Sequence, residues 1–163
     1  MNDGENSRRN GFSVFIKIAS TVFWLGYFPY APGTVGALPG LAIAVLMAYF
    51  NLPTIVYAAA TLLMIIAAIP ICTHAEKIFK VKDCRYIVLD EMVSMPITLF
   101  LIPMRLHLII IAFVLNRLAD IVKVPPANQS QRLRGGWGIV LDDVISGIYS
   151  NLVMQALVFI LPR

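Results

Sequence analysis

Charged residues are scarce in this sequence. Lysine, arginine, aspartate and glutamate make up 13% of the 163 residues, whereas soluble domains carry about 25%. Hydrophobic residues make up 59%, and the mean hydropathy is +0.80. Because so little polar surface cannot cover a water-soluble globule, the composition predicts an integral membrane protein, and the length predicts one domain.

Cysteine and histidine are also scarce, at two residues each. Cys72 and Cys84 match neither a C-x-x-C nor a zinc-ligand spacing, and no arginine follows either of them six positions later. This excludes a zinc site and a cysteine-phosphatase loop. His74 and His107 lie far apart in the topology below, so neither is expected to bind a metal. The net charge of +4 comes from scattered basic residues, which argues against a nucleic-acid partner.

Long uncharged or weakly charged segments dominate the chain. They cover residues 34–50, 54–72, 87–103, 108–122 and 137–161. The first two have 17 and 19 residues, about 26–28 Å as helices, which is enough for the bilayer core. Segment 12–24 is shorter and is expected to lie in the interface. The sequence therefore predicts an all-α, polytopic membrane bundle of about four to five spanning or half-spanning helices, with an interfacial N-terminal helix. Residues 1–11 are expected to form a polar cytoplasmic tail, and 12–163 the single domain.

The basic residues predict how these segments cross the membrane. With the N-terminus inside and five crossings, eleven basic residues fall on the inner side and two, Arg105 and Arg163, on the outer side. The inner set is Arg8, Arg9, Lys17, Lys77, Lys80, Lys82, Arg85, Arg117, Lys123, Arg132 and Arg134. This bias agrees with the positive-inside rule.

The same topology brings the acids of three segments to one membrane level. It places five carboxylates at the inner ends of their helices: Asp90, Glu91, Asp120, Asp142 and Asp143. Ionisable groups in apolar segments cost about 2.5–3.5 kcal/mol each on insertion scales and mark function by default. Adjacent like charges repel unless a cation lies between them. We therefore expect a hard divalent cation such as Mg²⁺, which takes oxygen ligands and binds substrate phosphates.

Neighbouring acids in a helix point about 100° apart, so one member of each pair is expected to bind the metal and the other to orient it or to accept a proton. Lys123 and Arg117 each lie three residues from Asp120, on the same helical face. Arg132 and Arg134 precede a glycine-rich stretch at the start of the last segment. Carboxylates, a metal and these basic residues together suit a phosphate ester.

The stretch "PGTVGALPG", residues 32–40, opens the first spanning segment at the same level. Gly36 and Gly40 form a small-residue packing motif, and Pro32-Gly33 predicts a turn. Thr34 is a candidate helix N-cap, and the positive end of that helix would face an anion. Gly33 and Thr34 are therefore candidates for binding a phosphate.

Other classes of protein also place acids in a membrane. A small divalent-cation or proton-coupled transporter is the first alternative, although its acids are expected near the bilayer midplane. A CDP-alcohol phosphotransferase needs a D-G-x-x-A-R run, which the sequence lacks. A membrane scaffold without activity is the third alternative.

Three motifs together resemble the phosphatidylglycerophosphatase A family. They are "IVLDEMVSMPITL", "NRLADIVKVPP" and "RLRGGWGIVLDDVISG", in this order after "PGTVGALPG". The resemblance begins at about Thr21 and covers nearly all of the chain that follows. It implies an integral protein of the bacterial inner membrane that uses Mg²⁺ to hydrolyse the terminal phosphate of phosphatidylglycerophosphate, and positive-inside charge places the site at the cytoplasmic face. The oligomeric state stays open.

Carried over by motif, the resemblance implies six catalytic candidates: Asp90, Glu91, Asp120, Lys123, Asp142 and Asp143. Asp90, Glu91, Asp120 and Asp142 are the candidate metal ligands, and Gly33, Thr34, Arg117, Arg132 and Arg134 the candidate substrate-binding residues. In the expected mechanism Lys123 and Arg134 neutralise the phosphate, and Glu91 or Asp143 activates a water. A covalent aspartyl-phosphate is the alternative.

Overall fold

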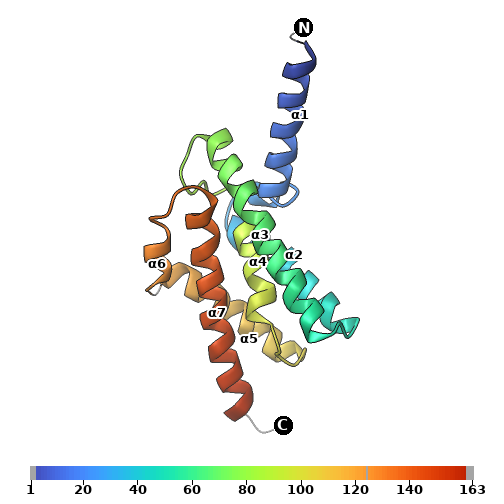
Figure 1. Ribbon diagram of the computed structural model, residues 1–163. Helices are drawn as coiled ribbons and strands as arrows, with labels where there is room; N and C mark the ends of the chain where they lie inside the picture. Colours follow the sequence, from blue (N-terminus) through green and yellow to red (C-terminus); the bar gives the residue numbers. More distant parts are fainter. Residues whose placement is uncertain (1–2, 124, 161–163) are drawn as a thin grey trace.

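The computed structural model describes residues 3–123 and 125–160, and this part of the chain is helical with no strand. The elements are α1 (Asp3–Ser20), a short 3-10 helix η1 (Leu25–Tyr27), α2 (Pro32–Tyr49), α3 (Thr54–Phe79), α4 (Leu89–Thr98), α5 (Leu106–Val122), α6 (Ala127–Ser130) and α7 (Gly136–Ile160). Helix α1 projects from one end of the bundle, and the last turns of α7 lie at the other end (Figure 1). The predicted all-α class is confirmed.

Three helices are long and apolar enough to cross a membrane. They are α2, α3 and α7, with 18, 26 and 25 residues. Helices α4 and α5 are shorter, at 10 and 17 residues. Segment 87–103 was one of the five apolar segments expected to cross the membrane, but within it only Leu89–Thr98 is helical. By length and composition, the bundle therefore combines three candidate membrane-spanning helices with two shorter ones, which is consistent with the predicted polytopic membrane protein.

Helix α4 lies in the middle of the bundle, where glycines of its neighbours allow close approach. A side chain at Gly36 of α2 would collide with Val88, and one at Gly40 with the backbone of Met92. From the other side, a Cβ at Gly147 of α7 would come within 3.0 Å of the Ser94 carbonyl oxygen. The predicted role of Gly36 and Gly40 in helix packing is therefore confirmed.

The C-terminal end of α4 lies inside the bundle, where water cannot satisfy its carbonyl groups. Side chains of α3 and α7 replace the water. Asn151 Nδ2 donates to the carbonyl oxygens of Thr98 (3.1 Å) and Phe100 (2.8 Å), and Gln155 Nε2 donates to that of Phe100 (3.1 Å). Tyr57 Oη donates to the Pro96 carbonyl oxygen at 2.9 Å. These bonds allow a helix of only 10 residues to end within the bundle.

Two helices extend beyond the predicted segments. Helix α1 begins at Asp3, so most of the segment expected as a polar tail is helical. Helix α3 continues to Phe79, seven residues beyond the predicted end, because the segment after Cys72 has no glycine or proline to stop it. Arg163, used above to predict the topology, lies outside the described residues.

The start of α2 also differs from the prediction. Pro32 occupies the first turn of the helix, and Ala31 is the N-cap with no side-chain hydrogen bond. Pro32-Gly33 is therefore not a turn before the helix, and Thr34 is not its N-cap. The reason is that proline suits the first helical position, where its fixed φ is favourable and its missing N–H costs nothing.

Candidate active site

Five carboxylates meet where three helices come together. Asp90 and Glu91 lie in the first turn of α4, Asp120 lies near the end of α5, and Asp142 and Asp143 lie in the second turn of α7. They form two groups whose ligand oxygens lie within 4.8 Å of one another. We call Asp90, Glu91 and Asp143 the first triad, and Asp120, Asp142 and Asp143 the second triad. The predicted convergence of the five acids is confirmed.

Each adjacent pair of acids contributes to a common triad. Asp90 and Glu91 both belong to the first triad, and Asp142 and Asp143 both belong to the second. The members of each pair can therefore bring ligand oxygens to one triad, and the expected division of roles within each pair stays a prediction. Carboxylate side chains carry their oxygens on one or two rotatable bonds, so two neighbours can bend toward one point even when their Cβ atoms diverge. Asp143, which was not among the predicted metal ligands, is the acid that both triads share.

Three oxygen atoms of the cluster are buried without a hydrogen-bond partner. They are Asp90 Oδ1, Glu91 Oε2 and Asp143 Oδ2. Asp90 and Asp143 are only 7% and 3% exposed. A buried carboxylate oxygen is costly unless a donor, a proton or a cation satisfies it. An all-oxygen donor set with unsatisfied atoms fits a hard divalent cation such as Mg²⁺.

Lys123 adds a positive charge beside the second triad. It follows α5 directly in a left-handed conformation, and its Nζ lies 2.9 Å from Asp142 Oδ2. Partial burial alone would lower the pKa of Lys123, but the hydrogen bond and charge of Asp142, with the charges of Asp120 and Asp83, raise that pKa above its ordinary value. The ammonium group is therefore charged at neutral pH. Gln131 Nε2 donates to the same Asp142 oxygen at 2.7 Å.

Arg117 is the second cation of the cluster. Its side chain is 11% exposed, and its Nη1 lies 3.4 Å from Asp120 Oδ2. Its guanidinium also faces Gly33 of α2, where an added Cβ would meet both Glu91 and Arg117. Gly33 therefore lies at the cluster as predicted, because it leaves room for these two side chains.

Asn116 fixes the position of Arg117. Asn116 is fully buried, accepts a hydrogen bond from Arg117 Nη2 (2.9 Å) and donates to Thr98 Oγ1 (2.9 Å). Ser94 Oγ lies 3.3 Å from the same Asn116 oxygen and donates to the Glu91 carbonyl oxygen at 2.9 Å. This network joins α5 to α4, so it sets the guanidinium relative to the carboxylates.

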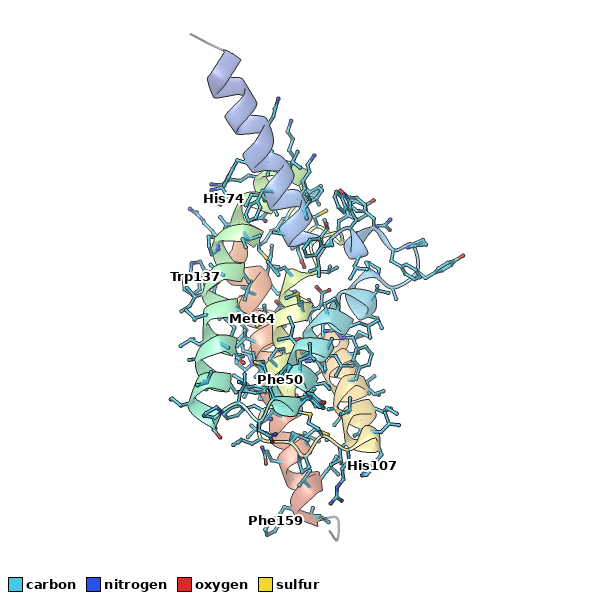
Figure 2. The ribbon with its side chains drawn as sticks, turned by 90° about the vertical axis from the view of Figure 1, so that its right-hand side faces the viewer. Phe50, Met64, His74, His107, Trp137 and Phe159 are labelled. Atoms are coloured by element: carbon cyan, nitrogen blue, oxygen red, sulfur yellow. The ribbon has the colours of Figure 1, made fainter. Side chains whose placement is uncertain are left out.

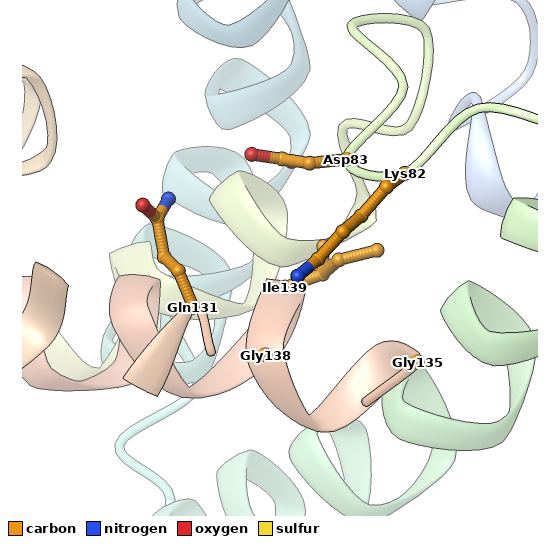
Figure 3. Close-up of a pocket in the computed structure, with 6 residues that line it drawn as sticks. All are labelled: Lys82, Asp83, Gln131, Gly135, Gly138 and Ile139. Carbon is orange, nitrogen blue, oxygen red and sulfur yellow. The ribbon is translucent and has the colours of Figure 1, made fainter. Parts of the chain in front are cut away.

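A pocket of about 250 Å³ includes a residue that is hydrogen-bonded to the second triad (Figure 3). It is lined by Lys82, Asp83, Gln131, Gly135, Gly138 and Ile139. Figure 3 shows the Asp83 and Gln131 side chains extending into it from opposite sides. Gln131 is hydrogen-bonded to Asp142, so this one lining residue links the pocket to the second triad.

Three predicted substrate-binding residues are not part of this cluster. Thr34, Arg132 and Arg134 are exposed, and none of them makes a hydrogen bond or ion pair with the five acids within the described residues. The two histidines were not expected to bind a metal. They lie at opposite ends of the bundle, His74 near α1 and His107 at the start of α5 (Figure 2).

The sequence reasoning missed Gln131 and Asn116. Gln131 lies in an irregular segment between α6 and α7, and no spacing rule connects it to Asp142. Asn116 offered one signal, because a carboxamide in an apolar helix needs partners inside the protein. That signal indicates a buried polar residue but does not name its partners.

The helices and the cluster together define a helical membrane protein with a carboxylate-rich, partly buried site at one level of the bundle. The family model for phosphatidylglycerophosphatase A matches residues 18–158. The chain therefore belongs to the phosphatidylglycerophosphatase A family, and it is an enzyme of that class, a phosphoric monoester hydrolase.

Three curated proteins are similar to nearly the whole chain. A Bacteroides thetaiotaomicron protein named "Putative phosphatidylinositol-3-phosphatase" is 34% identical over 84% of this chain and 89% of its own length. Phosphatidylglycerophosphatase A of Escherichia coli is 33% identical over 78% of this chain and 74% of its own. Phosphatidylglycerophosphatase A of Haemophilus influenzae is 32% identical over 87% and 88%. No solved structure matches the chain.

Proposed function

We propose that this protein hydrolyses the terminal phosphomonoester of phosphatidylglycerophosphate to phosphatidylglycerol and phosphate, with Mg²⁺ as its cofactor. Membership of the family and the names of two relatives support the substrate. The observation that carries the chemistry is the pair of carboxylate triads with three unpartnered buried oxygens. Their location at the end of the bundle where α2, α4 and α7 begin suits a reaction on lipid headgroups.

Asp90, Glu91, Asp120, Asp142 and Asp143 would hold the metal. When bound, Mg²⁺ would polarise the phosphate ester and stabilise the negative charge that develops in the transition state. The remaining roles fall to side chains of the chain itself. Lys123 and Arg117 bind the phosphate oxygens, and Glu91 accepts the proton of the attacking water.

We place the enzyme in the bacterial inner membrane, with its site at the cytoplasmic face. The support is the predicted excess of basic residues on the side of the bundle that carries the acids. The orientation can be tested with a Lys82→Cys variant in which this is the single cysteine. A membrane-impermeant thiol reagent added to intact cells should label it only after the cells are permeabilised.

The direct test is phosphate release from phosphatidylglycerophosphate by the purified protein. We expect activity with Mg²⁺, loss with EDTA and recovery when Mg²⁺ is added back. Asp90→Asn and Asp142→Asn should abolish the activity while the protein stays inserted. Glu76→Gln, which removes an acid outside both triads, is the matched control and should stay active. Retained activity in both aspartate variants would contradict this site.

Phosphatidylinositol 3-phosphate is the second candidate substrate. It is favoured by the name of the Bacteroides relative, which is 34% identical to this chain. Both lipids carry a phosphomonoester on a polar headgroup, so the same carboxylate cluster could serve either. Comparison of kcat/KM for the two lipids in the same vesicles decides between them. If neither lipid is hydrolysed in the presence of Mg²⁺, the transporter alternative is favoured.

A further inference from the structure

We propose that the cluster holds two divalent cations, one in each triad, with Asp143 as the ligand that bridges them. The first triad is Asp90, Glu91 and Asp143, and the second is Asp120, Asp142 and Asp143. This inference rests on the proposed metal dependence but not on the identity of the lipid substrate.

Geometry gives the first argument. Each triad offers three oxygen atoms that all lie within 4.8 Å of one another, and the two triads share a single residue. Mg²⁺ is commonly held by one or two carboxylates, with waters and substrate phosphates completing its coordination, so each triad has enough ligands for one ion. A carboxylate has two oxygens, so Asp143 can contribute one to each triad. Pairs of divalent cations about 3.5–4 Å apart are common in phosphatases, and a shared carboxylate suits such a separation.

The unpartnered atoms give an independent second argument. Asp90 Oδ1 and Asp143 Oδ2 belong to side chains more than nine-tenths buried, and neither has a hydrogen-bond partner. Glu91 Oε2 is unpartnered as well. All three atoms belong to residues of the first triad. The oxygens therefore need a partner that the described residues do not supply, and a cation is the partner that suits acceptor-only groups.

Charge gives the third argument. Five carboxylates face two cations, Lys123 and Arg117, so the cluster carries three excess negative charges. One divalent cation would leave it negative, whereas two would make it positive by one charge. A phosphate monoester carries about −1.5 to −2 at pH 7. Only the site with two cations would therefore attract the substrate.

The two triads differ in how far they are already neutralised. In the second triad, Asp142 is hydrogen-bonded to Lys123 and Gln131, and Asp120 pairs with Arg117. The first triad holds the unpartnered oxygens. We therefore expect stepwise binding, in which the first triad takes the tighter ion and the second triad the weaker one.

The experiment counts metal ions and does not depend on activity. Protein in lipid nanodiscs is stripped with EDTA, dialysed and titrated with Mn²⁺, with calorimetry for stoichiometry and electron paramagnetic resonance for the spin state. We expect two Mn²⁺ per chain, bound in two steps, and an exchange-coupled spectrum at saturation. Asp120→Asn should leave one tight, uncoupled ion, and Asp90→Asn one weak, uncoupled ion. Asp143→Asn should weaken both steps by at least about 10-fold and remove the coupling.

Glu76→Gln is the control and should bind two coupled ions. Helical circular dichroism confirms that each variant is folded. One Mn²⁺ per chain in the wild type, or two ions without coupling, would overturn the inference. Loss of all Mn²⁺ binding in both Asp90→Asn and Asp120→Asn would also overturn the inference, because it would mean that the two triads together form a single metal site. If the enzyme is active with one bound ion, this inference is refuted but the proposed function stands. If two coupled ions bind but the protein has no phosphatase activity, the proposed function is refuted but this inference stands.

Discussion

Polar side chains lie within the helical bundle at both ends of α4, but they differ in how their atoms are satisfied. At the C-terminal end, Asn151, Gln155 and Tyr57 donate hydrogen bonds to carbonyl groups that the helix leaves open. At the N-terminal end, Asp90 and Glu91 keep oxygen atoms without any partner. The two ends are only nine residues apart along one helix.

This difference separates polar residues that build the fold from those that bind a ligand. A carboxamide that replaces water at a helix end lowers the cost of ending that helix inside the bundle. A carboxylate with an unpartnered oxygen raises the cost of folding and persists where a ligand supplies the missing partner. The satisfied end of α4 therefore belongs to the scaffold, and the unsatisfied end is where we propose that the chemistry takes place.

The largest effect is expected at the unsatisfied end, with Asp143→Asn. Loss of a single preorganised electrostatic group costs about 10²–10³ in kcat, and Asp143 serves both triads. We expect phosphate release to fall by about 10³-fold or more, while thermal stability in detergent stays the same or rises, because a buried negative charge is removed. A variant that keeps a tenth of the wild-type activity would contradict the central role of Asp143.

A smaller effect is expected for Asn116→Ala. Asn116 has hydrogen-bond partners for its own side chain, and it positions Arg117 beside the carboxylates. The substitution frees Arg117 from its 2.9 Å hydrogen bond. Loss of such supporting partners typically costs about 10–100-fold. Steady-state kinetics should show the loss mainly in KM, because Arg117 is proposed to bind the phosphate in the ground state.

Asn116→Asp is the conservative comparison, since its carboxylate keeps the acceptor for Arg117 but loses the donor to Thr98. Its KM should lie between that of Asn116→Ala and that of the wild type. If both variants lose the same amount of activity, and a smaller fraction of folded protein accounts for the whole loss, Asn116 serves stability alone.

At the satisfied end, Asn151→Leu should change stability and not chemistry. It leaves the carbonyl oxygen of Thr98 without its side-chain donor and that of Phe100 with Gln155 alone. Unsatisfied buried groups cost about 1–3 kcal/mol. We expect a lower melting temperature with an unchanged kcat per folded molecule and an unchanged Mg²⁺ requirement. A change in the metal requirement would mean that the two ends of α4 are not independent.

The smallest effects are expected for Arg132→Ala and Arg134→Ala. Both residues are exposed and outside the cluster, and surface substitutions usually change free energies by about 0.5 kcal/mol or less. The activity of each variant should stay within about twofold of the wild type in neutral lipid vesicles. A tenfold loss for Arg134→Ala would show that it reaches the substrate, as the sequence analysis expected.

Some of the site could be predicted from sequence because it depends on topology alone. Once Asp90, Asp120 and Asp142 are assigned to the inner ends of helices, the bilayer brings them to one level whatever the packing. Gly36 and Gly40 were predictable for a similar reason, since their spacing places both on one helix face. The exposed positions of Arg132 and Arg134 were not predictable, because the irregular segment before α7 has no periodicity that orients a side chain.

By itself, the sequence determined that the protein is a helical membrane protein, which acids cluster and which family the motifs resemble. These properties follow from composition, helix length and charge placement, which need no knowledge of contacts. Only the tertiary structure decided that Asp143 belongs to both triads, that Gln131 and Asn116 support the cluster, and that Thr34 does not cap α2. Those features depend on side-chain rotation and on the approach of α2, α5 and α7 to α4, and helical periodicity does not encode either.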